Sequence, residues 1–241
     1  GTLDPLAEGV LPIAIGKTTK LIPFINKNIK EYEFEIKWCE QTSTDDSEGD
    51  IIARSTKIPS SLEINNQILK MKGNILQKPP YASAVKINGK KAYQLLRAKK
   101  NFHIKERLVY LDDVKVISSQ KQTTKFFIRC GKGFYIRSFA RDLGDKLATK
   151  AHISSLKRIK VGKFEANNAN LLDDLLNIRQ TLFEFKGFHS SSCMLDDILA
   201  YEVDEEKDIT SISQGKSIKL NLKKLIKTPL DLTEEKIIFL T

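Results

Sequence analysis

Residues 31–38 read EYEFEIKW, and charged and apolar side chains alternate along this stretch. Neighbouring residues of a strand point to opposite faces, so the apolar set shares one face and the charged set the other. This period of two predicts a half-buried β-strand. The stretch TSTDDSEGD (42–50) that follows is typical of a polar loop. The apolar face of the strand is formed by Tyr32, Phe34, Ile36 and Trp38.

Further regular structure is predicted on the C-terminal side of this strand. VYLDDVKVI (109–117) and KFFIRC (125–130) are rich in β-branched and aromatic residues and indicate two more strands. Ser60 and Glu63 have the spacing of a capping box. A short helix should therefore begin there and end near Met71.

The pattern changes to a helical period near residue 135. GKG (131–133) indicates a turn, and apolar residues then recur at spacings of three and four over about 135–150. Arg137 and Arg141 are one helical turn apart and should lie together on a second face. Strands and helices mixed without a regular βαβ rhythm indicate the α+β class. The apolar face is lined by Ile136, Phe139, Leu143 and Leu147.

The composition excludes several classes of protein. Hydrophobic residues make up 41% of the 241 residues and charged residues 29%, which argues against a disordered chain and against a membrane protein. No apolar run approaches the roughly 18 residues that a membrane-spanning helix needs. The cysteines are odd in number and far apart, so we expect no disulfide framework, no zinc site and a reducing cytoplasm. They are Cys39, Cys130 and Cys193.

The length allows one or two domains at roughly 150 residues each. A helix is predicted over about 171–185, and GFHSSSC (187–193) is the best candidate for a linker. We therefore expect a larger domain over residues 1–186 and a small, lysine-rich C-terminal region over residues 187–241.

The chain carries 40 Lys and Arg against 30 Asp and Glu, a net charge of +10. The basic residues are densest over 86–107, where Tyr93 and Phe102 are interleaved with them. Such a stretch suits a nucleic-acid phosphate backbone. A solvated surface is the alternative, and charge alone does not decide between the two.

The first twenty residues, GTLDPLAEGVLPIAIGKTTK, place Asp4 in an unusual setting. Pro5 keeps Asp4 out of helical conformation, and apolar residues follow. A carboxylate there loses its water unless it meets a cation. On these residues alone two interpretations stay open: a turn aspartate that caps the next segment, and a functional carboxylate.

This string resembles the signature of the TruB-type tRNA pseudouridine-55 synthases, roughly G-T-L-D-P-x-A-x-G-x-L-P followed by G-x-x-T-K, which Thr19 and Lys20 close. Further blocks resemble those of the family, in the same order, as far as about residue 165. LDDILAYEVDEEKDITSISQGKSI (195–218) resembles the start of the family's C-terminal region. The blocks are KEY (30–32) with TSTDDSEGD (42–50), KPPYASAVKINGKKAY (78–93), GKGFYIRSFARDLGDKL (131–147) and AHISSLKRIKVGKF (151–164).

The resemblance implies a fold and a reaction. The fold is the pseudouridine-synthase catalytic fold, with a mixed, largely antiparallel sheet and flanking helices, followed by a small C-terminal unit. The reaction is isomerisation of uridine 55 in the tRNA T-loop to pseudouridine. Family members usually carry some tens of residues before the GTLDP motif. We therefore expect that an N-terminal part of the catalytic domain is missing from this sequence.

The resemblance also assigns residues to the active site. Asp4 is the catalytic aspartate, and Arg137 is the cation that keeps it charged. Tyr135 supports the site, Asp46 holds Arg137 from the far side, and Tyr81 contacts the flipped base. The residues expected to bind RNA are Lys20, Lys86, Lys90, Lys91 and Arg97.

One position departs from the family pattern. The usual block reads PP-x-Tyr (or Phe)-Ser-Ala, whereas Ala82 stands at the aromatic position here and Tyr81 comes one residue early. KPP (78–80) forces an extended segment, in which adjacent side chains point to opposite faces. Tyr81 can therefore stack on a base only if the backbone bends locally. Otherwise the ring's role or full activity is lost.

The resemblance implies no cofactor, because the reaction transfers no group and involves no redox step. GKTT (16–19) does not complete a P-loop, since Leu11 stands where that motif needs glycine. We expect the T-arm of tRNA as partner, a monomer, no membrane and no obligatory protein partner. Two alternatives stay open: a tRNA-binding and folding module with impaired catalysis, and a subunit of a guide-RNA-directed complex like dyskerin.

Overall fold

The computed structural model describes residues 2–24, 29–176, 189–190, 199–201, 203–219, 225–227 and 238–240. The chain forms two compact units, which are described separately. Unit 1 comprises Gly1–Ile13 and Asn28–Gly187, and unit 2 comprises Ala14–Lys27 and Phe188–Thr241. The predicted linker falls almost entirely outside the described residues, so a boundary at residue 187 stays a prediction.

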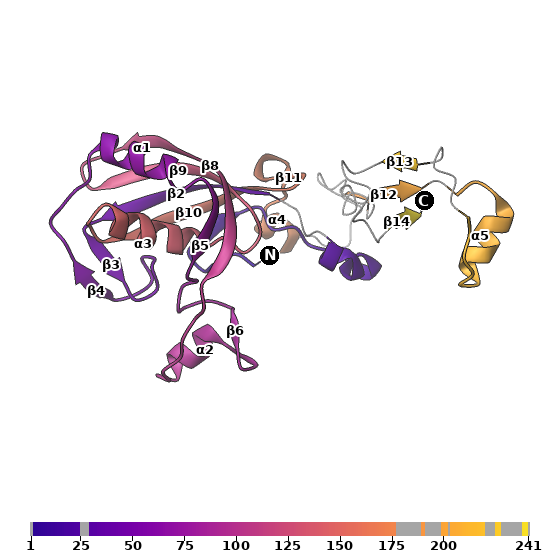
Figure 1. Cartoon of the computed structure of the whole chain (residues 1–241), viewed down its shortest axis with the longest axis horizontal. Helices are drawn as coiled ribbons and strands as arrows, with labels where there is room; N and C mark the ends of the chain where they lie inside the picture. The colour runs from indigo at the N-terminus through magenta and orange to yellow at the C-terminus, as the bar shows by residue number, and fades with distance from the viewer. Residues whose placement is uncertain are drawn as a thin grey trace. The chain divides into compact units, whose positions relative to one another are not determined.

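A seven-stranded sheet forms the centre of unit 1 (Figure 1), in the order β1-β10-β2-β9-β8-β5 with β11 paired to β10. The β1–β10 pair is parallel and the other pairs are antiparallel. This confirms the predicted α+β class with a mixed, largely antiparallel sheet. The strands are β1 (Ala7–Gly9), β2 (Lys30–Trp38), β5 (Gly73–Gln77), β8 (Arg107–Ser119), β9 (Thr123–Cys130), β10 (Ala151–Val161) and β11 (Phe164–Glu165).

The alternating sequence of β2 forms the middle of the core, as predicted. Its aromatic and aliphatic side chains are buried, and the charged side chains between them are only partly exposed. Phe34 stacks on Phe126 of β9 with ring centroids 5.3 Å apart. Phe139 of helix α3 (Ile136–Lys146) meets Phe34 edge to face at 5.9 Å. These aromatic contacts fix the helix on the two central strands.

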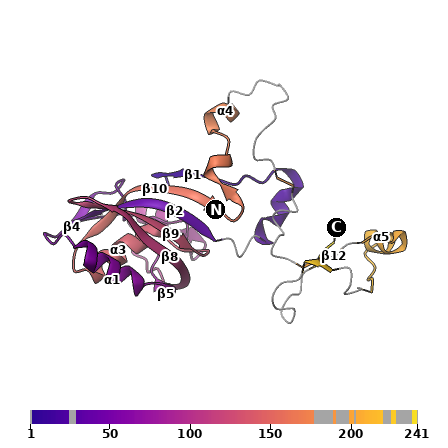
Figure 2. The same ribbon diagram turned by 90° about the horizontal axis from the view of Figure 1, so that it is seen from above.

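Two helices pack on the same side of the sheet (Figure 2) and contribute to one hydrophobic core. Helix α1 (Ser61–Leu69) begins at the predicted capping box: Glu63 N–H donates to Ser60 Oγ, and Ser60 N–H donates to Glu63 Oε2. Helix α3 ends earlier than predicted. Ala148 takes a left-handed conformation with φ of 54°, so the chain turns away and the Thr149 N–H bonds back to the Gly144 carbonyl.

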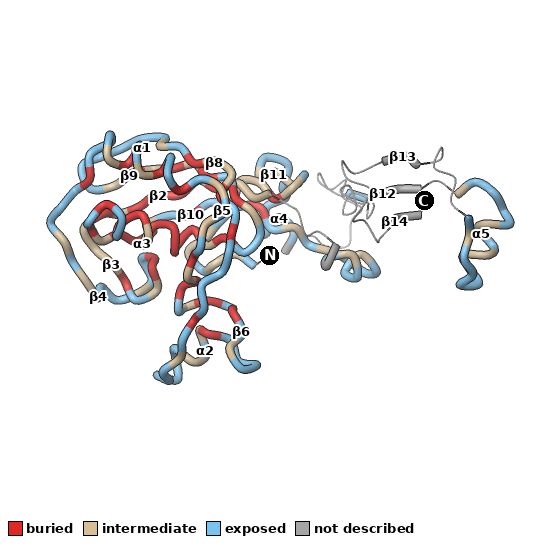
Figure 3. The backbone as a smooth tube through the Cα atoms, viewed as in Figure 1, coloured by how far each residue is buried: buried red, intermediate tan, exposed pale blue. Residues whose placement is uncertain are grey.

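Two small structures extend from this core. Strands β6 (Lys86–Ile87) and β7 (Lys90–Lys91) pair as a hairpin, and α2 (Ala92–Arg97) follows directly. This projection lies away from the sheet in Figure 1, and Figure 3 shows that most of it is exposed. On another side, β3 (Glu40–Thr42) pairs with β4 (Ile51–Arg54) and encloses the polar turn 43–50.

The described end of unit 1 contains η2 (Ala166–Asn168) and α4 (Leu172–Leu176), where the helix predicted over 171–185 begins. The rest of that prediction lies outside the described residues. Among those described, no helix is long and apolar enough to cross a membrane. Unit 2 contains η1 (Gly16–Phe24), α5 (Glu206–Ser213) and a sheet of β12 (Leu199–Tyr201) between β13 (Leu225–Lys227) and β14 (Ile238–Leu240).

Candidate active site

The predicted pair of Asp4 and Arg137 is present in unit 1. Arg137 Nε donates to Asp4 Oδ2 at 2.8 Å. The Arg137 side chain is 5% exposed and that of Asp4 is 34% exposed, so the carboxylate is open to solvent on one side only. From its sequence alone, an arginine on the first turn of α3 could also lie at the surface. Burial of its guanidinium requires partners on every side.

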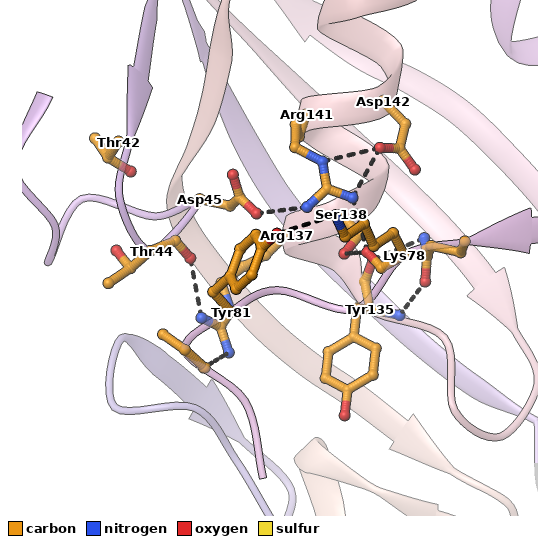
Figure 4. Close-up of polar contacts among 12 residues, drawn as sticks. Thr42, Thr44, Asp45, Lys78, Tyr81, Tyr135, Arg137, Ser138, Arg141 and Asp142 are labelled. Atoms are coloured by element: carbon orange, nitrogen blue, oxygen red, sulfur yellow. Dashed lines mark hydrogen bonds and ion pairs between the residues drawn. The ribbon is translucent and has the colours of Figure 1, made fainter. Parts of the chain in front are cut away.

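Those partners come from three segments that are far apart in the sequence, and Figure 4 shows the contact with Thr44 of the polar turn. Besides Asp4, Arg137 Nη1 donates to the Thr44 carbonyl at 3.0 Å, and Nη2 donates to the Ala82 carbonyl at 3.1 Å. Asp46 Oδ2 lies 3.3 Å from Arg137 Nη1. The planar guanidinium therefore joins the GTLDP segment, the polar turn and the proline-rich segment at one point.

Asp46 is itself held within its turn. Its Oδ1 accepts from the Glu48 N–H at 3.0 Å and from the Thr44 hydroxyl. The Asp46 carboxylate is thus oriented before it meets Arg137. The contact between Asp46 and Arg137, expected from the second sequence block, is present.

Gly9 fixes the segment that carries Asp4. Strand β1 pairs with β10, and the Val10 N–H donates to the Arg158 carbonyl at 2.9 Å. Gly9 has a φ of 106°, and a Cβ there would overlap that carbonyl oxygen. Arg158 Nε donates back to the Val10 carbonyl at 2.8 Å. The close approach requires glycine and holds the Asp4 segment against the sheet.

Tyr135 lies at the N-terminus of α3, two residues before Arg137. Its N–H donates to Gln77 Oε1 at 2.8 Å, and its carbonyl accepts from Gln77 Nε2 at 3.1 Å. Burial raises the pKa of the Tyr135 hydroxyl; Arg107 opposes this shift and Asp4 adds to it. The neutral phenol is therefore favoured beside the Asp4 carboxylate.

Tyr81 lies outside the core. It is 37% exposed, and the chain bends at Tyr81, Ala82 and Ser83 directly after the two prolines. The ring meets Phe102 edge to face at 5.4 Å, and Lys78 Nζ donates to its hydroxyl at 3.0 Å. The local bend needed for the displaced ring is present.

The expected RNA-binding lysines and arginine occupy two places. Lys86, Lys90, Lys91 and Arg97 are exposed on the β6–β7–α2 projection. Lys91 Nζ and Arg97 Cζ each lie 5.7 Å from the centre of the Tyr93 ring, so both cations flank one aromatic side chain.

Lys20 is exposed on η1 of unit 2. His152 is buried, and its Nδ1 is 2.9 Å from the Glu40 carbonyl oxygen. That contact gives His152 a structural role.

Several residues of the site had no assigned role in the sequence analysis. Ser138 Oγ and Arg141 Nη2 both donate to the Lys78 carbonyl at 2.7 Å. No sequence pattern indicated the contact of Gln77 with Tyr135, because no local rule relates a strand residue to the start of a helix 58 positions later. Arg141 gave one signal: its spacing of four from Arg137 placed both guanidinium groups on one helix face.

Solved structures share this fold. A chain in a crystal structure of a Cbf5–Nop10–Gar1 complex superposes with a TM-score of 0.67 at 22% identity, covering 90% of this chain and 58% of that one. A chain in a structure of an H/ACA RNP bound to a substrate RNA containing 2′-deoxyuridine gives a TM-score of 0.63 at 19% identity, with 90% and 57% covered.

Sequence relatives are closer. The tRNA pseudouridine synthase B of Ehrlichia ruminantium is 39% identical over 224 residues, which cover 92% of this chain and 76% of that protein. The protein of the same name from Bartonella henselae is 46% identical over 176 residues, covering 73% and 55%. The chain thus spans about three quarters of the first relative and about half of the second.

Two family profiles match adjacent parts of the chain, together residues 1–200. The TruB family pseudouridylate synthase N-terminal domain matches residues 1–136, and the tRNA pseudouridylate synthase B C-terminal domain matches residues 137–200. The fold and these matches define a pseudouridylate synthase. Within that class, the chain belongs to the TruB family.

Proposed function

We propose that this chain converts uridine 55 in the T-loop of tRNA to pseudouridine, with Asp4 as the catalytic residue. The N1–C1′ bond breaks, the base turns, and C5 bonds to C1′. The proton on C5 leaves to solvent and N1 takes one up, so the product is an isomer of the substrate. Family membership and relatives called tRNA pseudouridine synthase B support this proposal.

The observation that carries the proposal is the ion pair of Asp4 and Arg137. A carboxylate with one open side can stabilise positive charge at C1′, attack C1′, or help remove the proton at C2′. Each role needs an ionised group in a site from which the substrate excludes water. The Arg137 guanidinium, with Nε 2.8 Å from Asp4 Oδ2, holds the carboxylate in place for each of these roles.

The RNA has to present a uridine that is buried in its loop, so the base must flip into the site. The β6–β7–α2 projection and the basic residues that follow it as far as Arg107 supply positive charge for the phosphate backbone, and Tyr81, in contact with Phe102, offers a ring for stacking. We propose that the chain acts in the cytoplasm as a monomer without an obligatory protein partner, and that the reaction needs no cofactor.

Tritium release from a tRNA transcript that carries [5-³H]uridine tests the proposal. The full protein should release one equivalent of label per transcript. A matched transcript with cytidine in place of uridine 55 should release none. Binding of the transcript without release would show a binding module, and release that depends on added proteins would show a subunit of a larger complex.

A further inference from the structure

Arg141 joins the same two segments as Arg137, one turn further along α3. Arg141 Nη1 donates to Asp45 Oδ2 at 2.8 Å, and Nη2 donates to the Lys78 carbonyl at 2.7 Å (Figure 4). Asp45 belongs to the polar turn 43–50, and Lys78 belongs to the proline-rich segment. Arg141 therefore connects the polar turn with the proline-rich segment.

The polar turn is shaped for this contact. Asp45 has a φ of 61°, a conformation that few residues other than glycine adopt, and it is 6% exposed. Its neighbour Asp46 faces Arg137 instead. Two consecutive aspartates thus meet two arginines one helical turn apart. Burial raises the pKa of Asp45, and the charge of Arg141 opposes this rise.

The proline-rich segment is held at two points by the same helix. The Lys78 carbonyl accepts from Arg141 and from Ser138, and the Ala82 carbonyl accepts from Arg137. Tyr81 lies between these points. The spacing of Arg137 and Arg141 on α3 therefore fixes the positions of the Lys78 and Ala82 carbonyls relative to the helix.

We propose that Arg141 is a positioning residue for the isomerisation: it fixes the spacing of the turn and the proline-rich segment, and so the orientation of Arg137 toward Asp4. The proposal rests on the proposed function. The Arg141 side chain is only 14% exposed, and it also pairs with Asp142 beside it on α3, so its effect passes through these protein groups rather than through the RNA.

Arg141→Lys tests this, because lysine keeps the charge and loses the planar fork that reaches two acceptors at once. We expect the single-turnover rate at saturating enzyme to fall by about ten- to a hundredfold, as a displaced catalytic group does. The enzyme concentration at half-saturation with tRNA should stay within a few-fold of the parent. Asp45→Asn keeps an acceptor oxygen and removes the charge. It should also lower the single-turnover rate, but by less than Arg141→Lys does.

Two controls separate positioning from general effects. Arg129→Lys makes the same change in an exposed ion pair between β9 and β8 and should leave the rate unchanged. Ile68→Val lowers the melting temperature through the buried core at α1, a helix that supplies none of the four residues bound by Arg137, and should leave the rate of folded protein unchanged.

The outcomes are distinct. An inactive parent would overturn the proposed function, and the positioning role with it. An active parent with Arg141→Lys at the parental rate would overturn the positioning role alone. A rate loss no larger than that of Ile68→Val at equal loss of melting temperature would also overturn it, because stability would then explain the effect. If Arg141→Lys does not fold, an Asp45→Asn variant at the parental rate would count against the proposal.

Discussion

Arg137 donates its Nε hydrogen to Asp4 across 133 residues of sequence, at a distance of 2.8 Å. The contact depends on a sheet that brings the N-terminal segment beside β10 and on a helix whose apolar face is buried on that sheet. The guanidinium thus reaches the carboxylate from a rigid element. A charged pair set in this way is positioned before the substrate arrives.

Asp4→Asn should abolish release of tritium and leave tRNA affinity within a few-fold of the parent. Asparagine keeps the shape of the side chain and removes the charge that the reaction needs at the ribose. Single-turnover release and filter binding on one preparation measure both quantities. Measurable turnover by Asp4→Asn would contradict the assignment of the catalytic residue.

Arg137→Gln should lower the free energy of unfolding by about 3–5 kcal/mol, the usual loss when one partner of a buried ion pair is removed. The substitution leaves the buried Asp46 without its cation and two carbonyls without their donor. Urea unfolding measures the loss. Arg129→Gln, in an exposed pair, should cost at most about 1 kcal/mol. Equal losses in the two variants would show that Arg137 contributes no more than a surface arginine.

Neutralising Lys90, Lys91 and Lys99 together should flatten the plot of log affinity for tRNA against log salt by about two units, at about 0.7–0.9 per phosphate contact. All three are exposed on the projection or directly after it. Lys115, Lys121 and Lys125, on or near β8 and β9, offer a control triple variant with the same change of charge. An equal change of slope in both variants would indicate a general field rather than a binding surface.

Glu63→Gln should make the melting temperature less dependent on pH. Hydrogen bonds from Lys57 and from the Ser60 N–H lower the pKa of Glu63 to about 2, from a usual value of 4.5. Because the pKa of Glu63 is lower in the folded protein than in the unfolded chain, its ionised carboxylate stabilises the fold at pH values above about 4.5. This contribution is lost as pH falls from about 4.5 toward 2.

The difference in melting temperature between the parent and Glu63→Gln should therefore be largest from pH 5 to 7, and it should vanish near pH 2. Thermal scans at a series of pH values measure it. Glu106→Gln, in an exposed loop, serves as the control. A difference that does not change with pH would contradict a role for the Glu63 charge.

Local signals predicted most of the elements that form the site. The alternation of EYEFEIKW and the apolar spacing of residues 136–147 are set by burial on one face, and burial is visible in sequence. The predicted end of α3 was wrong by a few residues, because the left-handed conformation of Ala148 has no sequence signature. A non-glycine residue takes that conformation only when tertiary contacts support it.

The site was predictable to the extent that its motifs resemble those of a family. The pairing of Asp4 with Arg137 came from that resemblance, since no local rule relates positions so distant. The contacts of Gln77, Ser138 and Arg141 with backbone atoms were not predictable. Backbone carbonyls are the same at every residue, so only the folded path of the chain selects which of them a side chain reaches.

The displaced aromatic residue gives the last prediction: Tyr81 supplies the stacking ring despite its position one residue early. Tyr81 does not lie in the core, since the residue is 37% exposed. The bend at Tyr81–Ser83 after the two prolines frees the ring from the strict alternation of an extended segment. Tyr81→Ala should therefore weaken binding in the transition state by roughly 1–3 kcal/mol, the usual range for an aromatic platform.

Three variants separate stacking from support of the basic projection. Tyr81→Phe keeps the ring and its contact with Phe102 but loses the hydrogen bond from Lys78, and it should retain the parental rate. Ala82→Tyr in the Tyr81→Ala background should restore activity only in part, because the larger side chain displaces the bend whose carbonyl accepts from Arg137 Nη2. Phe102→Ala removes the neighbour and leaves Tyr81 in place. If Phe102→Ala lowers the single-turnover rate as much as Tyr81→Ala does, at similar melting temperatures, the ring acts by holding the projection and the stacking role is wrong.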